Sequence, residues 1–435
     1  MGNVDKLVRY LKRNGVSNTY YAVMERLFFR DVPFNADSSE KRAVSENYAL
    51  DETIRFSIVV PVYETKEEHL RDMIDSVLSQ IYGNFELVLA DASKSGRPKA
   101  IIESYRDERI KYVEVKENKS ISDNTNVGLM AATGDYVGLL DHDDLLTEDA
   151  LYECALEITE CKRQGINPLM IYSDEDKCNG DASKFFGRHY KQKLNLDLLL
   201  SNNYICHFTV IDTNLIKTLK FRGEYNGSQD YDLFLRVVGA SKEEEVRHIP
   251  KVLYHWRCHE GSTAFNPASK EYAYIAGKKA IMDFVKTKFN ADWDVVELSH
   301  KGFYRVVFED DIFEKRPDIG AIGGRVAHKN KITSGILYKD GTEIYSNMNR
   351  HFTGYMHRAV LSQDVYALDI RTLKVRPELE DYLKELLNEL KAFEDKCDFR
   401  EFSVDEYAKV LGLKMGERIA SLGMKVLFTN EVLDL

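Results

Sequence analysis

Apolar strand-like runs alternate with helix-like segments from residue 54 onward, and this alternation limits the fold more than any other feature. The runs are rich in Val, Ile, Leu and aromatic residues, and they read IRFSIVVPVYE, NFELVLADAS, RIKYVEVKE and DYVGLLDHDD. Helix-like segments at 66–80, 98–106 and 122–132 separate them. Such alternation predicts βαβ units and a parallel sheet, and nearly continuous apolar strands indicate that helices cover both of its faces.

Polar residues end each of the four strand-like runs. They are Tyr63 and Glu64, Asp91 and Ser93, Glu117 and Asn118, and finally Asp141 to Asp144. In open α/β sheets the ligand binds beyond the carboxyl ends of the strands. We therefore expect these side chains at the ligand-binding edge of the sheet.

The stretch DHDD at residues 141–144 is the strongest candidate site, because unpaired carboxylates this close together repel one another. Asp141 and Asp143 are two positions apart, so in an extended conformation they point the same way. Together they would hold Mg²⁺ or Mn²⁺ and leave other positions for phosphate oxygens and water. An EF-hand is excluded, because Leu145 stands at the fifth loop position and Tyr152 at the twelfth.

A structural use of the same cluster remains open. Asp144 or Thr147 would cap the following helix, which we expect from Leu146 to Ile158. Capping and metal binding are compatible, since they involve different carboxylates.

Two further groups are weaker signals on their own. Asp230 and Asp232 lie in GSQDYDLFLR, where Ser228 is the expected N-cap and Asp230 falls in the first helical turn. In YHWRCHEGSTA, Arg257 and His259 precede a Gly-Ser-Thr loop and suit a phosphate or a metal. Helix capping and an ordinary structural histidine are the alternatives.

Charge and cysteine content exclude several classes of protein. The 435 residues carry a net charge of −11, which argues against general nucleic-acid binding. The six cysteines form no CxxC pair and predict reduced thiols of a cytosolic protein. The sequence has no apolar run of 18 residues, so we expect no membrane span. The N-terminus has no apolar core of signal-peptide type.

Residues 1–31 form a basic segment, with six Lys or Arg against three acidic residues. Two amphipathic helices are expected there, separated by a break at Asn14-Gly15, and residues 32–52 read as a linker. One interpretation is a helical hairpin packed on the main domain. The other is peripheral contact with an anionic membrane surface.

The motifs occur together, and in this order, in a known family. Residues 54–285 resemble a family 2 glycosyltransferase of the GT-A fold. The matching stretches are FSIVVPVYE, DAS, LLDHDDLL as the DxD motif, YSDEDK, GSQDYDLFLR and HIPKVLYHWRCHEGSTA. The last two resemble bacterial members for O-antigen or rhamnan-type cell-surface polysaccharide assembly. YKQKLNLDLL at 190–199 departs from the Lys-Pro-Asp of such enzymes, in a region that faces the acceptor in the family.

The resemblance implies a role for each candidate residue. Asp230 would be the general base of an inverting displacement, and Asp143, Asp141 and His259 would hold Mn²⁺ or Mg²⁺. Donor-nucleotide contacts would come from Pro61, Tyr63, Glu64, Asp91, Asn126, Asp141 and Arg257. The acceptor side would include Asp174, Glu175, Gln229 and Trp256.

The predicted organisation has three parts. A helical segment and linker occupy 1–50, a GT-A domain 51–290, and a mixed α/β region 291–435. The last region faintly resembles the second half of another GT-A domain, with Asp405-Glu406 where that half would have its base. No second DxD motif precedes it, so an inactive remnant used for packing or a homo-oligomer contact is preferred over a second active site.

The predicted function is metal-dependent, inverting sugar transfer from a UDP- or dTDP-sugar to a hydroxyl of a polysaccharide or lipid-linked glycan. We expect a cytoplasmic location, with peripheral contact at the inner face of the membrane as one alternative. A nucleotidyltransferase would also use carboxylate-bound metal, but it usually has a glycine-rich phosphate loop, and none occurs at the first strand-helix turn. The third alternative is an inactive sugar-nucleotide-binding or scaffold protein.

Overall fold

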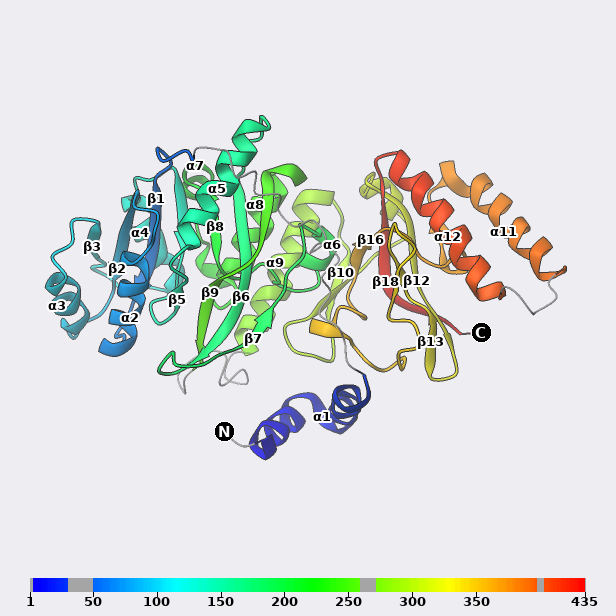
Figure 1. The fold of residues 1–435 in the computed structure, drawn as a ribbon, viewed down its shortest axis with the longest axis horizontal. Coiled ribbons are helices and arrows are strands. Elements are labelled where there is room, and N and C mark those ends of the chain that lie inside the picture. The colour runs from blue at the N-terminus through cyan, green and yellow to red at the C-terminus, as the bar shows by residue number, and fades with distance from the viewer. Residues whose placement is uncertain (1–2, 30–49, 259–270, 397–402, 435) are drawn as a thin grey trace. The chain divides into compact units, whose positions relative to one another are not determined.

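The computed structural model describes residues 3–29, 50–258, 271–396 and 403–434. The chain forms two compact units. The central unit contains Asn35–Leu194 and Asn203–Phe284, and the terminal unit contains Met1–Phe34, Asn195–Asn202 and Val285–Leu435. Figure 1 shows the course of the chain through both.

A nine-stranded sheet organises the central unit, in the order β3-β2-β1-β4-β8-β6-β9-β5 with β7 paired to β6. The strands β1 to β4 pair in parallel, whereas β8 is antiparallel to both β4 and β6. The bounds are β1 Phe56–Val62, β2 Phe85–Asp91, β3 Ile110–Glu114, β4 Tyr136–Leu139, β5 Leu145–Leu146, β6 Met170–Asn179, β7 Phe185–His189, β8 Thr209–Asp212 and β9 Val246–Cys258.

Helices cover both faces of the parallel part of this sheet, as the continuous apolar strands predict. On one face, α2 (Glu67–Leu78) and α5 (Ala150–Arg163) enclose a core that includes Ile58 and Val60 of β1. On the other, α4 (Ile121–Ala131) approaches so closely that a Cβ on Gly128 would lie 2.8 Å from Val59 Cγ1. Neighbouring strand residues thus face opposite layers. The expected α/β fold class is confirmed, although the sheet is mixed.

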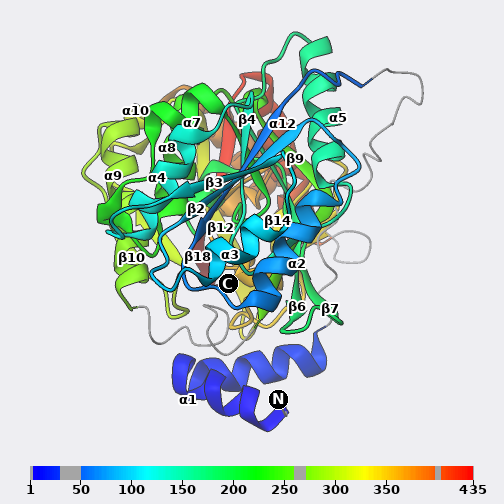
Figure 2. The same cartoon turned by 90° about the vertical axis from the view of Figure 1, so that its left-hand side faces the viewer.

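Of the other helices of the central unit, α3 connects the parallel strands β2 and β3, and the rest follow β8 in the sequence. They are α3 Arg97–Ser104, α7 Thr213–Leu219, η1 Gly223–Tyr225, α8 Gln229–Ala240, η2 Glu243–Glu245 and α9 Glu271–Phe289, of which α9 runs into the terminal unit. Figure 2 views the same ribbon from the side of the parallel strands.

The terminal unit has its own sheet, ordered β13-β12-β18-β16 with β17 paired to β12. Its strands are β12 Ile319–His328, β13 Lys331–Ser334, β16 Gln363–Val365, β17 Lys374–Val375 and β18 Lys425–Asp434, joined by the small pairs β10 Asp294–Glu297 with β11 Tyr304–Val307 and β14 Ile336–Leu337 with β15 Glu343–Ile344. Its helices are α1 Asn3–Phe28, α6 Leu196–Leu199, α10 Ile312–Lys315, α11 Glu380–Glu394 and α12 Val404–Ser421, with short turns η4 Tyr355–His357, η5 Ile370–Thr372 and η6 Pro377–Leu379.

The N-terminal segment α1 bends at Gly15, whose φ of 76° is left-handed, so the break expected there is confirmed. Its partner differs from the expected main domain. Tyr21 stacks on His351 with ring centroids 4.6 Å apart, and the Glu25 carboxylate accepts the backbone N–H groups of Thr353 and Gly354. The segment therefore packs on the terminal unit, where its tyrosine ring and its glutamate carboxylate have these partners.

Two other predictions can be compared with the described residues. The five cysteines that the structure describes are thiols outside any disulfide, and Cys397 lies outside the described residues. No helix among the described residues is long and apolar enough to cross a membrane.

Candidate active site

A cavity of about 460 Å³ opens in the central unit near the carboxyl ends of β1 and β4. Several residues expected at the ligand-binding edge line it, together with others that the sequence did not indicate. The polar and ring-bearing residues used below are Pro61, Asp141, Cys206, His207, Gln229, Asp230 and Trp256. The structure therefore brings Asp141 and Asp230, 89 positions apart in the sequence numbering, to one cavity.

The DHDD stretch is a tight turn rather than the extended segment that we expected. His142 and Asp143 form the turn, and the Asp144 N–H donates to the Asp141 carbonyl at 3.3 Å. Asp141 lines the cavity, and Asp143 Oδ1 lies 3.9 Å from His142 Nδ1. Asp141 and Asp143 are thus placed by a turn and not by alternation along a strand.

Asp144 is a buried structural carboxylate and not a helix cap. It accepts the Tyr254 hydroxyl at 2.5 Å and the Arg257 backbone N–H at 2.7 Å. Burial raises its pKa well above the usual value, and the nearby charges of Asp143 and Asp141 act in the same direction. The helix α5 starts only at Ala150, so both caps expected for a helix from Leu146 are wrong.

Arg257 holds this turn through the Asp143 carbonyl. The sequence had predicted that Arg257 contacts the donor, and its buried position does not agree with that prediction. Its side chain is fully buried. Nε donates to the Asp143 carbonyl at 2.6 Å, one terminal nitrogen to the Gly180 carbonyl at 2.8 Å, and the other to the Asp72 carboxylate at 2.9 Å. In this arrangement the guanidinium orients the DxD turn and presents no surface to a ligand.

Asp230 lies in the first turn of α8, where the helix dipole favours a carboxylate. Its Oδ2 accepts the Asn203 side-chain amide at 2.9 Å. Burial raises its pKa, while the neighbouring His207 charge lowers it and Asp141 raises it. Ser228 is the N-cap by position, but its hydroxyl donates to the Ala273 carbonyl instead. A half-buried carboxylate that lines a cavity and has a raised pKa has the properties of a general base.

Asp232 has a different role, although it stands only two positions later. It is 1% exposed and forms ion pairs with Arg222 and Arg236, with an Arg222 Nε contact at 3.1 Å and an Arg236 Nη2 contact at 2.7 Å. These three side chains join α8 to the segment before η1. Asp232 therefore stabilises the helix that carries Asp230.

His207 is the main cavity residue that the sequence analysis missed. Its Nδ1 lies 3.2 Å from Glu175 Oε2, and its ring stacks on Tyr254 at 4.6 Å. Burial opposes the charged imidazole, yet the neighbouring Cys206 and Glu175 raise its pKa well above the usual value. The only sequence signal was a histidine at the start of a strand-like run, which is too common to assign a function.

The residues expected on the acceptor side divide into two groups. Asp174 and Glu175 are buried in β6, where Asp174 accepts from His248 at 2.9 Å and Glu175 lies 3.4 Å from the Lys191 ammonium. Lys191 belongs to the stretch that departs from the family pattern. Gln229 and Trp256 line the cavity, and Gln229 also accepts the Gly227 N–H at 2.7 Å.

Glu175, Cys206 and His207 bring one possible ligand atom each to within 4.8 Å of one another, the geometry of a metal-binding group. The buried Lys191 ammonium already neutralises Glu175 and donates to the Ile205 carbonyl at 2.6 Å. We therefore interpret this group as a charge network under the cavity.

The residues expected around the donor nucleotide are spread along the sheet edge. Tyr63 is exposed, Pro61 lines the cavity, and Asp91 accepts the Ser93 N–H at 2.9 Å and the Tyr112 hydroxyl at 3.3 Å. His259 lies outside the described residues.

Glu64 and Asn126, which were also expected to contact the donor nucleotide, form hydrogen bonds with backbone groups of nearby loops. Glu64 Oε1 accepts the N–H groups of Lys94 and Ser95 at 2.9 and 3.0 Å. The Ser95 side chain, followed by the backbone N–H of Lys94, lowers the pKa of Glu64. The Asn126 amide forms two hydrogen bonds with the backbone of Phe221, at 2.8 and 2.9 Å. Glu64 thus joins the loops after β1 and β2, and Asn126 fixes the start of the segment that leads to α8.

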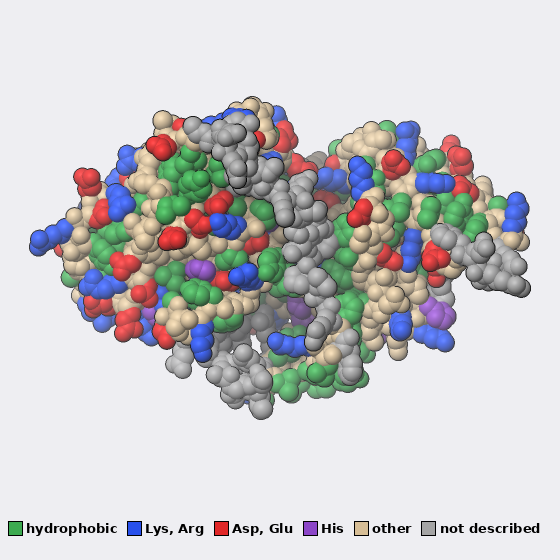
Figure 3. All heavy atoms as spheres, viewed as in Figure 1, with side chains coloured by type: hydrophobic (Ala, Val, Ile, Leu, Met, Phe, Trp, Pro, Cys, Tyr) green, Lys and Arg blue, Asp and Glu red, His purple; other side chains and the backbone are tan. Residues whose placement is uncertain are grey.

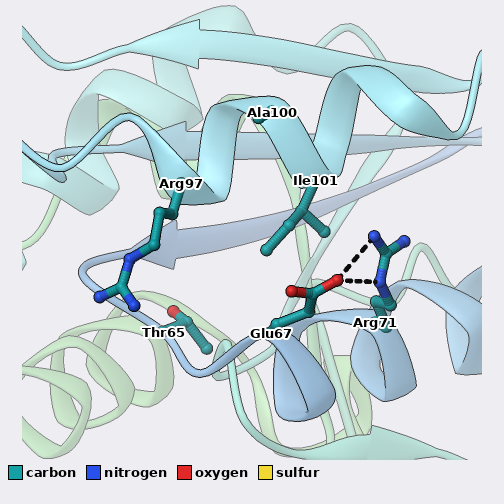
Figure 4. Close-up of a pocket in the computed structure, with 6 residues that line it drawn as sticks. All are labelled: Thr65, Glu67, Arg71, Arg97, Ala100 and Ile101. Carbon is teal, nitrogen blue, oxygen red and sulfur yellow. Dashed lines mark hydrogen bonds and ion pairs between the residues drawn. The ribbon is translucent and has the colours of Figure 1, made fainter.

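A second cavity, of about 320 Å³, lies beside the loop after β1. Figure 4 shows Arg97 and Thr65 on one side of it and the ion pair of Glu67 with Arg71, 2.9 Å long, on the other. Thr65 is 7% exposed, and its hydroxyl makes no hydrogen bond with any described residue. The cavity extends the polar edge beyond Tyr63 and Glu64.

The chain is similar to known proteins over this same region. The family model described as "Glycosyl transferase family 2" matches residues 57–219. An uncharacterized protein y4gI of Sinorhizobium fredii is 38% identical over 52% of this chain and 25% of its own length. The O-antigen biosynthesis protein RfbC of Myxococcus xanthus is 30% identical over 52% of this chain and 18% of its own length. The chain thus spans a quarter or less of these two relatives.

A shorter relative and a solved structure extend the comparison. The Escherichia coli protein WfaP, named as a UDP-Glc:alpha-D-GlcNAc-diphosphoundecaprenol beta-1,3-glucosyltransferase, is 26% identical over 48% of this chain and 80% of its own length. Staphylococcus aureus TarS 1-349 in complex with UDP-GlcNAc has a TM-score of 0.44 at 17% identity, covering 55% of this chain and 68% of its own. The family match includes β1 from Ser57 onward, the DHDD turn and His207, so residues 57–219 of this chain match the glycosyl transferase family 2 domain.

Proposed function

We propose that this chain is an inverting glycosyltransferase that moves a sugar from a nucleotide-sugar to a hydroxyl of a polysaccharide or lipid-linked glycan. The observation that carries the proposal is the meeting of Asp141 and Asp230 at one cavity, inside or next to the family 2 domain. Asp141 belongs to an acidic turn suited to a cation, and Asp230 is a half-buried carboxylate whose pKa is raised. Two carboxylates in unlike environments are expected to have two different roles.

Asp230 would act on the acceptor. Its carboxylate takes the proton of the acceptor hydroxyl, and that oxygen attacks the anomeric carbon from the side opposite to the leaving group. The new glycosidic bond forms as the bond from the anomeric carbon to the diphosphate breaks, and the nucleoside diphosphate departs with that electron pair. Asn203, which donates to Asp230 Oδ2, would keep the other carboxylate oxygen directed at the acceptor.

The residues of the DxD turn fit a hard divalent cation. Asp141 and Asp143 supply carboxylate oxygens, the ligand type that Mg²⁺ and Mn²⁺ prefer, and Arg257 holds the turn by the Asp143 carbonyl. We assign Asp143 and Asp141 to the cation, with His259 as a further ligand candidate. A bound cation there would neutralise charge on the leaving diphosphate.

Donor binding would follow the sheet edge. Tyr63 offers an exposed ring for the base and Asp91 a carboxylate beside it, whereas Glu64 and Asn126 would act indirectly by holding their loops. Gln229 and Trp256 are assigned to the sugar or acceptor because they line the same cavity as Asp230. The relative WfaP, whose name specifies UDP-Glc and a diphosphoundecaprenol-linked acceptor, supports a UDP-sugar and a lipid-linked glycan.

The terminal unit would have no catalytic site of its own. Asp405, placed by the sequence where a second base would stand, pairs with Arg371 at 2.7 Å, and Glu406 completes the cap of α12 with Ser403. These structural uses support the interpretation that the unit serves packing or self-association.

The test is a panel of UDP-, dTDP- and GDP-sugars with Mn²⁺, scored for hydrolysis and for transfer to glycan acceptors. At least one donor should be turned over by the wild type and not by Asp230→Asn. Turnover of a nucleoside triphosphate with release of pyrophosphate, and of no sugar donor, would instead support the nucleotidyltransferase alternative.

A further inference from the structure

The second half of α1 exposes a row of large apolar side chains. Val16, Tyr20, Val23 and Leu27 are 77, 57, 37 and 69% exposed. Their spacing of four, three and four residues places them within about 60° of one another around the helix. They form one continuous face, which we call the apolar stripe.

The first half of α1 continues this pattern beyond the bend at Gly15. Leu7, Val8 and Leu11 are also exposed, at neighbouring positions of one helix face. Figure 3 shows hydrophobic side chains, in green, over the part of the surface where Figure 1 draws α1. Soluble proteins rarely expose so many contiguous large apolar groups without a partner.

The apolar stripe is not the face by which α1 packs on its own chain. That contact uses Tyr21, Met24 and Glu25, which meet the core and the loop of residues 351–354 in the terminal unit. Tyr21 and Glu25 lie on the other side of the helix from Val16 and Leu27, and Met24 lies between the two faces. The segment is therefore anchored on one face and open on the other.

The charge of residues 1–31 indicates which kind of partner the apolar stripe binds. Residues 1–31 carry six basic and three acidic residues, although the whole chain has a net charge of −11. Lys12 and Arg26 are exposed, whereas Glu25 is occupied by two backbone N–H groups. A basic helix with an exposed apolar face fits the headgroup region of an anionic bilayer. A second copy of the chain would set the same basic groups against each other, which is unfavourable.

We propose that α1 docks this chain on an anionic lipid surface, with the apolar stripe entering the headgroup region and the opposite face fixed to the terminal unit. The inference does not depend on the proposed transfer reaction. It extends the membrane interpretation of residues 1–31 by naming the contact residues and by separating them from the face that packs on the protein.

The experiment is sedimentation of the full-length protein with vesicles of phosphatidylcholine alone or mixed with phosphatidylglycerol. The wild type should bind the mixed vesicles and lose that binding as salt increases. Val16→Glu with Leu27→Glu should weaken binding by at least about tenfold, because two apolar groups then resist insertion. Lys12→Glu with Arg26→Glu should weaken binding to the mixed vesicles specifically.

The matched control is Leu387→Glu with Val410→Glu, since these residues are exposed apolar side chains of α11 and α12. It should bind vesicles as the wild type does. Unfolding temperatures of all variants check that the fold is kept. Equal binding by the stripe variant and the control, or no binding by the wild type, would overturn the proposal. So would a stripe variant that changes the dimer content in light scattering while its lipid binding is unchanged.

Discussion

Asp230 and Asp232 are separated by one residue and have opposite surroundings. Asp230 faces the cavity and has one side-chain amide donor, while Asp232 is enclosed by two arginines. We expect Asp230→Asn to lower kcat by about 10²–10⁴-fold, because an amide cannot accept the acceptor proton. Its donor affinity, measured by calorimetry with Mn²⁺, should stay within a few-fold.

The Asp232→Asn variant should lose stability instead of catalytic activity. Removing one partner of a buried ion pair leaves uncompensated charge and costs about 3–5 kcal/mol of unfolding free energy. Chemical denaturation should reveal this loss, and turnover per folded molecule should remain near normal. If Asp232→Asn is stable and inactive, the base belongs at position 232.

The charge of His207 should be visible in the pH profile. Burial raises the pKa of Asp230, and the His207 charge opposes that increase. Because a base works only when deprotonated, kcat/KM should fall as pH decreases through a pKa above the ordinary aspartate value of 3.8. His207→Gln removes the positive charge, so the acid limb should move to higher pH. An unchanged limb with a lower plateau would mean that His207 has only a structural role.

At the scale of elements, the DHDD turn is held by a strand and a helix that are distant in sequence. Arg257 of β9 joins the Asp143 carbonyl to Asp72 of α2. We expect Asp72→Asn to raise the Mn²⁺ concentration for half-maximal activity several-fold and also to lower the unfolding temperature, because the fully buried Arg257 guanidinium loses its carboxylate partner. Glu68→Gln, an exposed change on the same helix, is the control.

Metal removal tests the turn itself. EDTA should abolish transfer, and Mn²⁺ or Mg²⁺ should restore it, since carboxylates alone cannot neutralise a leaving diphosphate. Full activity in chelator, measured on purified protein, would contradict the assignment of Asp141 and Asp143.

The alternation of strands and helices was enough to predict the parallel part of the sheet and its polar edge, because burial on both faces leaves a clear sequence pattern. The use of each polar residue at that edge was harder to predict. Arg257 and Asn126 look like ligand contacts in sequence, yet each bonds to a group at least 95 positions away. Only the tertiary structure decides between a ligand and a distant backbone group as the partner. His207 was missed for the same reason, since its partner Glu175 lies on another strand.

At the scale of the whole molecule, the terminal unit is expected to be structural. Asp405 pairs with Arg371 on the surface of α12, and such exposed pairs contribute at most about 1 kcal/mol. We therefore expect Asp405→Asn to leave kcat and the unfolding temperature nearly unchanged. Loss of transfer in this variant alone would assign a catalytic role to the terminal unit.

The last strand of the sequence, β18, lies between β12 and β16 in the middle of the terminal sheet. During synthesis, α1 and residues 195–202 leave the ribosome before residues 425–434, although all of these segments belong to the same unit. The unit to which the basic, apolar α1 belongs therefore stays incomplete on the nascent chain until β18 has been made. A chaperone or a lipid surface can meet this helix well before its own protein provides the packing partner.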